Sequence, residues 1–103
     1  MNMNQVFFAL ADSTRRAVLE QVRDRPRSVQ QIADKLPVSR PAVSQHLKVL
    51  KEANLVVENA QGTKRIYQLN PAGWQQLRTY LDEYWESAML SFKNHIERKF
   101  PND

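Results

Sequence analysis

The chain has 103 residues, of which 42% are hydrophobic, and its formal net charge is +4. This length suits one domain over residues 1–103, and because no apolar run reaches membrane-spanning length and no signal-peptide pattern is present, we expect a soluble, cytoplasmic protein. The chain contains no cysteine, which excludes disulfides, thiolate metal sites and thiol-based redox sensing.

The first 24 residues predict two helices. The apolar residues of a short first helix are Val6, Phe7, Phe8 and Leu10. Asp12 can cap a second helix over about residues 13–24. The apolar positions of that helix are Ala17, Val18 and Val22.

Residues 28–50 contain two short helical patterns that are joined by a turn. Ser28 can cap the first and Gln31, three residues later, can return a hydrogen bond, which predicts a helix at about residues 29–36. Pro37 disfavours its continuation, and Ser39 can cap a second helix from Arg40 to about Ala53. This arrangement predicts a helix-turn-helix whose second helix enters a DNA major groove.

The two faces of this second helix differ in chemistry. Its apolar stripe consists of Ala42, Val43, Leu47 and Leu50. The opposite face presents Arg40, Ser44, Gln45, Lys48 and Lys51. Glutamine can pair with adenine edges and arginine with guanine, whereas the two lysines are better placed for phosphate. The alternative is an amphipathic helix with a merely solvated polar face.

Two short β-runs follow, Leu55–Asn59 and Arg65–Leu69, around a loop that ends in Gly62. They predict the hairpin wing of a winged helix. Lys64 and Arg65 lie near its tip, where they could contact the flanking DNA backbone or minor groove. The alternative is that these charges only protect a strand edge from aggregation.

Asn70 and Pro71 can begin a last helix that continues to about Lys99, which is roughly 42 Å at 1.5 Å per residue. Its apolar residues are Trp74, Leu77, Leu81, Tyr84, Trp85, Ala88, Met89, Phe92 and Ile96. This set is wider than one core-facing stripe, so we expect a second copy of the chain to cover it. The alternative is a larger core within a monomer. A two-fold dimer would place its recognition helices ~34–36 Å apart, on an inverted repeat.

Three segments, ALADSTRRAVLEQV, SRPAVSQHLKVLKEANLV and GTKRIYQL, resemble the ArsR-type family of small dimeric winged-helix transcriptional repressors. The resemblance covers roughly residues 4–98. It implies a mainly α fold with a β-hairpin wing, in which four helices precede the hairpin and one long helix follows it. The implied DNA-reading residues are Ser39, Arg40, Pro41, Ala42, Ser44, Gln45, His46 and Lys48, with Lys64 and Arg65 in the wing. The terminal helices are implied to form the homodimer, with Val6, Phe7, Leu10, Leu77, Leu81, Tyr84, Trp85, Met89 and Phe92 at the interface.

Many relatives sense metals, but the ligand positions in this chain argue against a metal. Ser28 and Gln30 stand where metal-sensing members carry Cys-x-Cys. The other family site maps onto Asp82, Tyr84, His95 and Arg98, of which only the first and third match. We therefore expect no metal and no cofactor. Whether a protein or a small molecule acts as inducer stays open.

Positive charge is concentrated in the half of the chain that contains the helix-turn-helix. Residues 12–27 carry five arginines, among them Arg15, and residues 39–68 carry five Lys or Arg against Glu52 and Glu58. Electrostatic capture of DNA requires such a distribution. We expect a sequence-specific DNA-binding regulator, most simply a homodimeric (auto)repressor on an inverted-repeat operator. The alternative is a winged-helix protein-interaction module with weak DNA affinity. No catalytic constellation can be assembled, so an enzyme is not expected.

Overall fold

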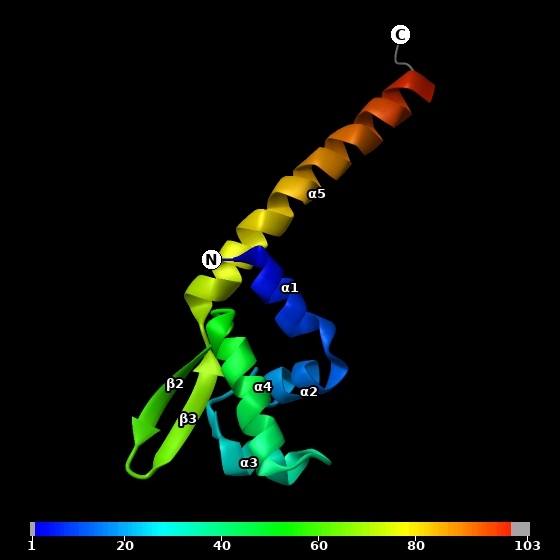
Figure 1. Cartoon of the computed structure of the whole chain (residues 1–103). Helices are drawn as coiled ribbons and strands as arrows, with labels where there is room; N and C mark the ends of the chain where they lie inside the picture. The colour runs from blue at the N-terminus through cyan, green and yellow to red at the C-terminus, as the bar shows by residue number, and fades with distance from the viewer. Residues whose placement is uncertain (1, 100–103) are drawn as a thin grey trace.

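The computed structural model describes residues 2–99. The sequence also predicts a frayed tail at Pro101–Asp103, which lies outside the described residues. These residues form five helices and three short strands (Figure 1). The helices are α1 (Met3–Ala11), α2 (Ser13–Gln21), α3 (Val29–Lys35), α4 (Arg40–Glu52) and α5 (Pro71–Lys99). The strands are β1 (Arg27–Ser28), β2 (Val56–Gln61) and β3 (Lys64–Leu69). The expected order of four helices, a hairpin and a long last helix is confirmed.

The sheet is antiparallel with the strand order β1-β3-β2. Its hairpin is longer than the sequence indicated, because pairing continues to Gln61 opposite Lys64 and leaves only a two-residue turn. Gly62 opens that turn with a φ of +63°, a conformation that glycine adopts without steric cost. The strand β1 was not predicted, since two residues carry no periodic signal.

Helix α4 is the central element of the body and packs against α1, α2, α3 and β2 (Figure 1). Val43, Leu47 and Leu50 on its inner face are fully buried. Ile32 of α3 and Leu55, which directly precedes β2, join the same core. Burial of such side chains stabilises the fold by about 1.5–3 kcal/mol each, so this stripe determines which face of α4 is left for solvent.

The helix caps expected from the sequence are present. The side chain of Asp12 accepts a hydrogen bond from the Arg15 backbone N–H (2.8 Å), and Ser28 and Gln31 form a reciprocal capping box. Helix α2 ends at Gln21 rather than near residue 24. The backbone N–H groups of Val22 and Arg23 donate to the oxygens of Leu19 and Glu20, three residues earlier, which is a tighter turn than that of an α-helix. Pro26, which disfavours helical geometry before it, follows closely.

Arg15 has an internal role that its place in a basic cluster did not indicate. It is only 8% exposed, and its guanidinium donates to the backbone oxygens of Ala9 (2.7 Å) and Phe8 (3.0 Å). These carbonyls end α1 and have no partner within that helix. Arg15 therefore fixes α1 to α2 and adds little to the surface charge.

Helix α5 is attached to the body by its first turns only. Gly73 and Leu77 are buried, and the indole N–H of Trp74 donates to the Leu55 backbone oxygen (3.0 Å). From Leu81 to Lys99 every residue is exposed. The molecule is consequently 69 Å long, and its radius of gyration is 18.8 Å, against about 13 Å for a compact chain of 100 residues. Within residues 2–99, no helix is both long and apolar enough to cross a membrane.

Gly73 is required by a close backbone contact. A Cβ atom at this position would lie 1.7 Å from the backbone oxygen of Asn54, a residue with a φ of +63° at the end of α4. Helix propensity favours alanine over glycine by about 1 kcal/mol, but the contact is with backbone that cannot rotate away.

We therefore expect Gly73→Ala to lower the free energy of unfolding by about 1–3 kcal/mol, the usual cost of overpacking. Urea denaturation followed by circular dichroism measures this change. Gln76→Ala, at an exposed position of the same helix, is the control and should be close to neutral. A Gly73→Ala variant as stable as the parent would contradict the close approach of α5 to Asn54.

Candidate nucleic-acid interface

The outer face of α4 is polar and exposed at its N-terminal half. Ser39 caps the helix by accepting a hydrogen bond from the Ala42 N–H (3.3 Å), and Pro41 occupies the first turn. The exposed residues of this face are Ser39, Arg40, Pro41, Ser44, Gln45 and Lys48. They lie opposite the buried stripe, so the anchoring of α4 itself turns them outward.

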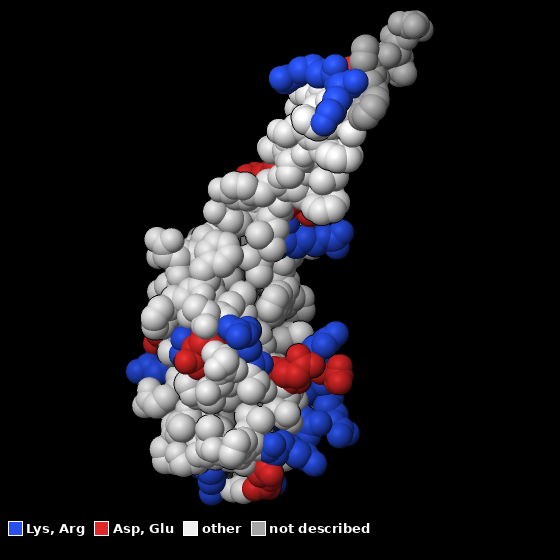
Figure 2. Space-filling view, turned by 90° about the vertical axis from the view of Figure 1, so that its right-hand side faces the viewer, with Lys and Arg blue, Asp and Glu red and all other residues white. Residues whose placement is uncertain are grey.

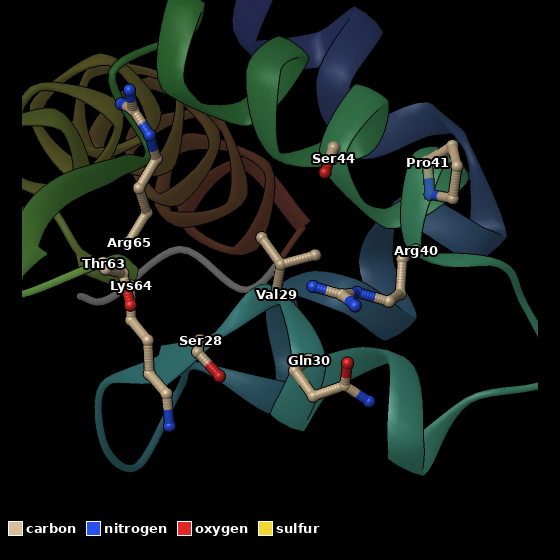
Figure 3. A pocket seen from close by; sticks show the side chains of 9 residues that line it. All are labelled: Ser28, Val29, Gln30, Arg40, Pro41, Ser44, Thr63, Lys64 and Arg65. Carbon is tan, nitrogen blue, oxygen red and sulfur yellow. The ribbon is translucent and has the colours of Figure 1, made fainter.

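An open hollow of about 570 Å³ lies between the starts of α3 and α4 and the tip of the hairpin (Figure 3). Its lining residues are Ser28, Val29, Gln30, Arg40, Pro41, Ser44, Thr63, Lys64 and Arg65. In Figure 3 the guanidinium of Arg40 extends from α4 toward α3, whereas Lys64 and Arg65 leave the hairpin in opposite directions. Three segments that are separate in the sequence thus form one polar and basic surface.

Gln30 and Thr63 belong to this surface but were not predicted there. The sequence analysis considered Gln30 only as one of the positions where metal-sensing relatives carry cysteine. In the structure its side chain donates a hydrogen bond to Asp34 (2.6 Å). Thr63 stands in the hairpin turn. Their nearness to Arg40 results from tertiary packing and cannot be predicted from the residues next to them in the sequence.

His46 lies elsewhere than the resemblance implied. It is half-buried, and its Nδ1 atom is 3.5 Å from the Arg15 guanidinium. Helical spacing explains this position, because residue 46 is a neighbour of both Val43 and Leu50 on the inner side of α4. Ala42 is also half-buried. Of the DNA-reading positions expected on α4, the outward face therefore contains all except Ala42 and His46.

The two cations of the wing also differ from each other. Lys64 is exposed at the start of β3. Arg65 is exposed too, but its guanidinium lies 3.2 Å from the carboxylate of Glu58 on β2. Lys51 of α4 approaches the same carboxylate oxygen (2.5 Å), and the Tyr67 hydroxyl donates to the other (2.8 Å). Glu58 thus connects α4 with both strands of the hairpin.

This cluster changes the acid–base properties of its members. The hydrogen bond from Lys51, followed by that from Tyr67, lowers the pKa of Glu58 to about 2. Burial and the bond to Glu58 raise the pKa of Tyr67 to about 12. Glu58 is consequently ionised and Tyr67 protonated at neutral pH.

Charged and uncharged surfaces are separated along the molecule. Figure 2 shows Lys and Arg side chains gathered with a few acids on the lower body, and a mainly uncharged surface above them. Further cations occur at the far end of α5, where Arg98 and Lys99 form the last turn. The body that carries the outer face of α4 is thus the more highly charged part of this view.

The residues expected at the dimer interface fall into two groups. Val6 is fully buried and Leu77 is 6% exposed, so both belong to the core of one chain. These two side chains attach α1 and the start of α5 to the body of their own chain, so they are not available to a second copy. Leu10 is half-buried. The exposed members are Phe7, Leu81, Tyr84, Trp85, Met89 and Phe92, and Phe8, Leu90 and Ile96 are also exposed.

Comparison with known proteins identifies this arrangement. Residues 12–57 match the model of the bacterial regulatory protein arsR family. Over 89 residues the chain is 53% identical to the HTH-type transcriptional regulator Rv2034 of Mycobacterium tuberculosis, covering 86% of this chain and 83% of that protein. The chain belongs to the ArsR family.

Two further matches agree with this assignment. The transcriptional repressor SdpR of Bacillus subtilis is 35% identical over 68 residues, which are 66% of this chain and 76% of that protein. The crystal structure of the ArsR family transcriptional regulator RHA00566 superposes with a TM-score of 0.76 at 28% identity, covering 84% of this chain and 96% of that one. As an ArsR-family member, the chain is a DNA-binding transcriptional regulator with a winged helix-turn-helix and not an enzyme.

The positions at which metal-sensing ArsR proteins hold their ion have other contacts here. Ser28 takes part in the capping box of α3. Asp82 forms an ion pair with Arg78 (3.8 Å), and His95 is exposed one turn before Arg98. Within residues 2–99, no three His, Asp or Glu side chains lie together as a metal site would require.

We expect Glu58→Gln to flatten the pH dependence of stability in acid. The carboxyl group has a pKa of about 2 in the folded chain against an ordinary 4.5, so its stabilising effect is complete above pH 4.5 and is lost as the pH falls toward 2. Urea denaturation of the parent and the variant over this pH range measures the difference. Glu52→Gln, which removes a carboxylate without an ion pair in residues 2–99, is the control. Parallel curves for Glu58→Gln and the parent would contradict the cluster.

Proposed function

We propose that this chain acts as a homodimeric repressor that binds an inverted-repeat operator. In this proposal the N-terminal half of α4 enters the major groove and the hairpin lies on the flanking backbone. The observation that carries the proposal is the exposure of Arg40, Ser44 and Gln45 on the face opposite the buried stripe. An α-helix fixed by its inner face and polar on its outer face suits direct readout of bases.

Each exposed side chain receives a role from its chemistry. Arg40 and Gln45 can form bidentate bonds with guanine and adenine edges, and Ser44 can bond to a base or a phosphate. Ser39 and Pro41 stand at the helix start, where the chain approaches the groove most closely. Lys48 and Lys64 are assigned to phosphates, because a single ammonium is a point charge that fixes position without reading sequence.

The dimer is supported by the apolar surface of α5. Trp85 is 65% exposed, Tyr84 62% and Phe92 61%, on a helix that no other part of residues 2–99 covers beyond its first turns. An apolar surface of this kind marks an interaction site. A second copy is the simplest occupant because a two-fold axis lets the same surface cover itself. In the view of Figure 2 the surface above the charged body is mostly uncharged, with a few charged side chains among it.

Repression is proposed from the regulatory function together with the resemblance to SdpR, which is named a transcriptional repressor. A dimer on an inverted repeat covers about two turns of DNA. If the repeat lies within a promoter, this footprint excludes the polymerase. Control of the chain's own promoter is the simplest form of such a circuit.

Substitutions on α4 and on the wing should have different effects on DNA binding. We expect Arg40→Ala or Gln45→Ala to reduce discrimination between operator and random duplex by about 1–3 kcal/mol, because each removes a base contact. Lys64→Ala should weaken binding to all duplexes about equally and reduce the salt dependence. Fluorescence anisotropy with both duplexes at several salt concentrations separates the two effects.

Lys93→Ala is the control for the loss of one positive charge, since Lys93 lies near the far end of α5. It should leave discrimination unchanged. If all three variants on α4 and the wing bound both duplexes as the parent does, the assigned face would be wrong. A parent protein that bound all duplexes equally weakly would favour a protein-interaction module instead.

We expect Trp85→Glu to dissociate the dimer. The substitution places a charge in the centre of the proposed apolar interface, where burial of an ionised carboxylate is costly. In analytical ultracentrifugation at micromolar concentration, the parent should sediment at twice the chain mass of 12.0 kDa and the variant at 12.0 kDa. Glu86→Gln, which changes a charge at the next residue, should stay dimeric. A parent that sediments at 12.0 kDa would exclude the dimer.

A further inference from the structure

Glu58 is an acidic residue beside a surface that is proposed to meet a polyanion. Its carboxylate binds two cations from two other elements, Lys51 of α4 at 2.5 Å and Arg65 of β3 at 3.2 Å. The Tyr67 hydroxyl holds the second carboxylate oxygen at 2.8 Å. Both cations are thereby paired with a group on the protein.

The two cations lie where DNA phosphates are expected. Arg65 lines the same hollow as Arg40, Ser44 and Lys64. Lys51 follows Ser44 and Lys48 at spacings of seven and three residues, and therefore continues the outer stripe of α4. The side chain of Lys51 is 50% exposed and that of Arg65 is 69% exposed, so solvent or a phosphate could reach either one.

Glu58 is the fixed member of this cluster. Its side chain is 19% exposed, far less than that of either cation, and it lies in a regular strand pair opposite Tyr67. Tyr67 is itself only 8% exposed and anchors the carboxylate to the core. The cations have long flexible side chains, whereas the carboxylate has a fixed position. The anion therefore determines where the two positive charges stay.

We propose that Glu58 limits sequence-independent DNA binding by holding Lys51 and Arg65 away from phosphates. This inference rests on the DNA-binding face of the proposed function. Affinity for random DNA is set by the number of cations that replace counterions on the phosphates. A carboxylate that occupies two such cations lowers that number, and its own charge repels the backbone. Because phosphate contacts carry no sequence information, this loss leaves the base contacts of Arg40 and Gln45 a larger share of the total binding free energy.

A purely structural role of Glu58 would have the opposite consequence. If the carboxylate only fixed the hairpin to α4, its loss would loosen the wing, and Lys64 would be presented to the backbone less accurately. Binding to random duplex would then become weaker or stay the same. The sign of the change therefore distinguishes the two roles.

The first test compares Glu58→Gln with Glu52→Gln. Both remove one negative charge, and at position 58 glutamine keeps an oxygen that can accept a hydrogen bond from the Tyr67 hydroxyl. Glu52 is exposed at the end of α4 and has no ion pair within residues 2–99, so it measures the general effect of charge. The probe is a random-sequence duplex, and its affinity is measured from 50 to 200 mM salt.

We expect Glu58→Gln to bind this duplex more tightly than Glu52→Gln at low salt. The ratio of affinities at 50 and 200 mM salt should also rise, by about 3.5-fold for each released cation that reaches a phosphate, which follows from a slope of about 0.9 per contact. An equal affinity and slope in the two variants, or weaker binding by Glu58→Gln, would overturn the proposal.

A second test begins with a comparison in the parent protein, which does not depend on the folding of Glu58→Gln. In the parent, Arg65→Gln should reduce affinity for random duplex several-fold less than Lys64→Gln does. The reason is that Arg65 is already paired with Glu58, whereas Lys64 is not. In the Glu58→Gln background, the effect of Arg65→Gln should rise to that of Lys64→Gln. Equal losses from both substitutions in the parent would overturn the proposal.

Two variants distinguish a wrong role for Glu58 from a wrong DNA-binding face. If Arg40→Ala and Lys64→Ala leave DNA binding unchanged, the DNA-binding face itself is wrong. If both variants behave as expected and Glu58→Gln matches Glu52→Gln, only the role of Glu58 is wrong.

Discussion

The burial of one apolar stripe on α4 is the constraint on which the rest of the structure depends. Val43, Leu47 and Leu50 are fully buried, and they are spaced so that a single side of the helix faces the core. A helix held in this way has no freedom to rotate about its axis without exposing two or three large side chains. The direction of the polar face is therefore a consequence of the hydrophobic effect, and the polar residues themselves contribute little to it.

Local signals were sufficient to predict most of the fold and part of the site. Asp12, Ser28 and Ser39 act on backbone N–H groups only a few residues away, so their capping function can be read from the sequence. The exposed face of α4 could be predicted for the same reason, because helical spacing alone assigns Ser44 and Lys48 to one side. The hairpin and the last helix were likewise predicted from the residues, whereas the full set of DNA-reading positions and the dimer interface residues came from the resemblance to a family.

Features that depend on tertiary packing could not be predicted. Arg15 was counted as surface charge although it caps α1, and His46 was placed on the DNA face although it lies against Arg15. The pairing of Glu58 with Lys51 joins a helix to a strand, and no pattern in the chain brings these residues together. In each case a polar side chain is occupied by a group from another element, which a one-dimensional pattern does not reveal.

The contact between Gly73 and Asn54 connects the two functional halves of the molecule. Asn54 follows the end of α4, and the absence of a Cβ at Gly73 lets α5 begin directly against its backbone. Trp74 adds a hydrogen bond to Leu55 at the same place. Since α5 is a continuous helix from there, its direction is fixed relative to α4. In the proposed dimer through α5, this joint and the crossing of the two α5 helices together set the distance between the two α4 helices.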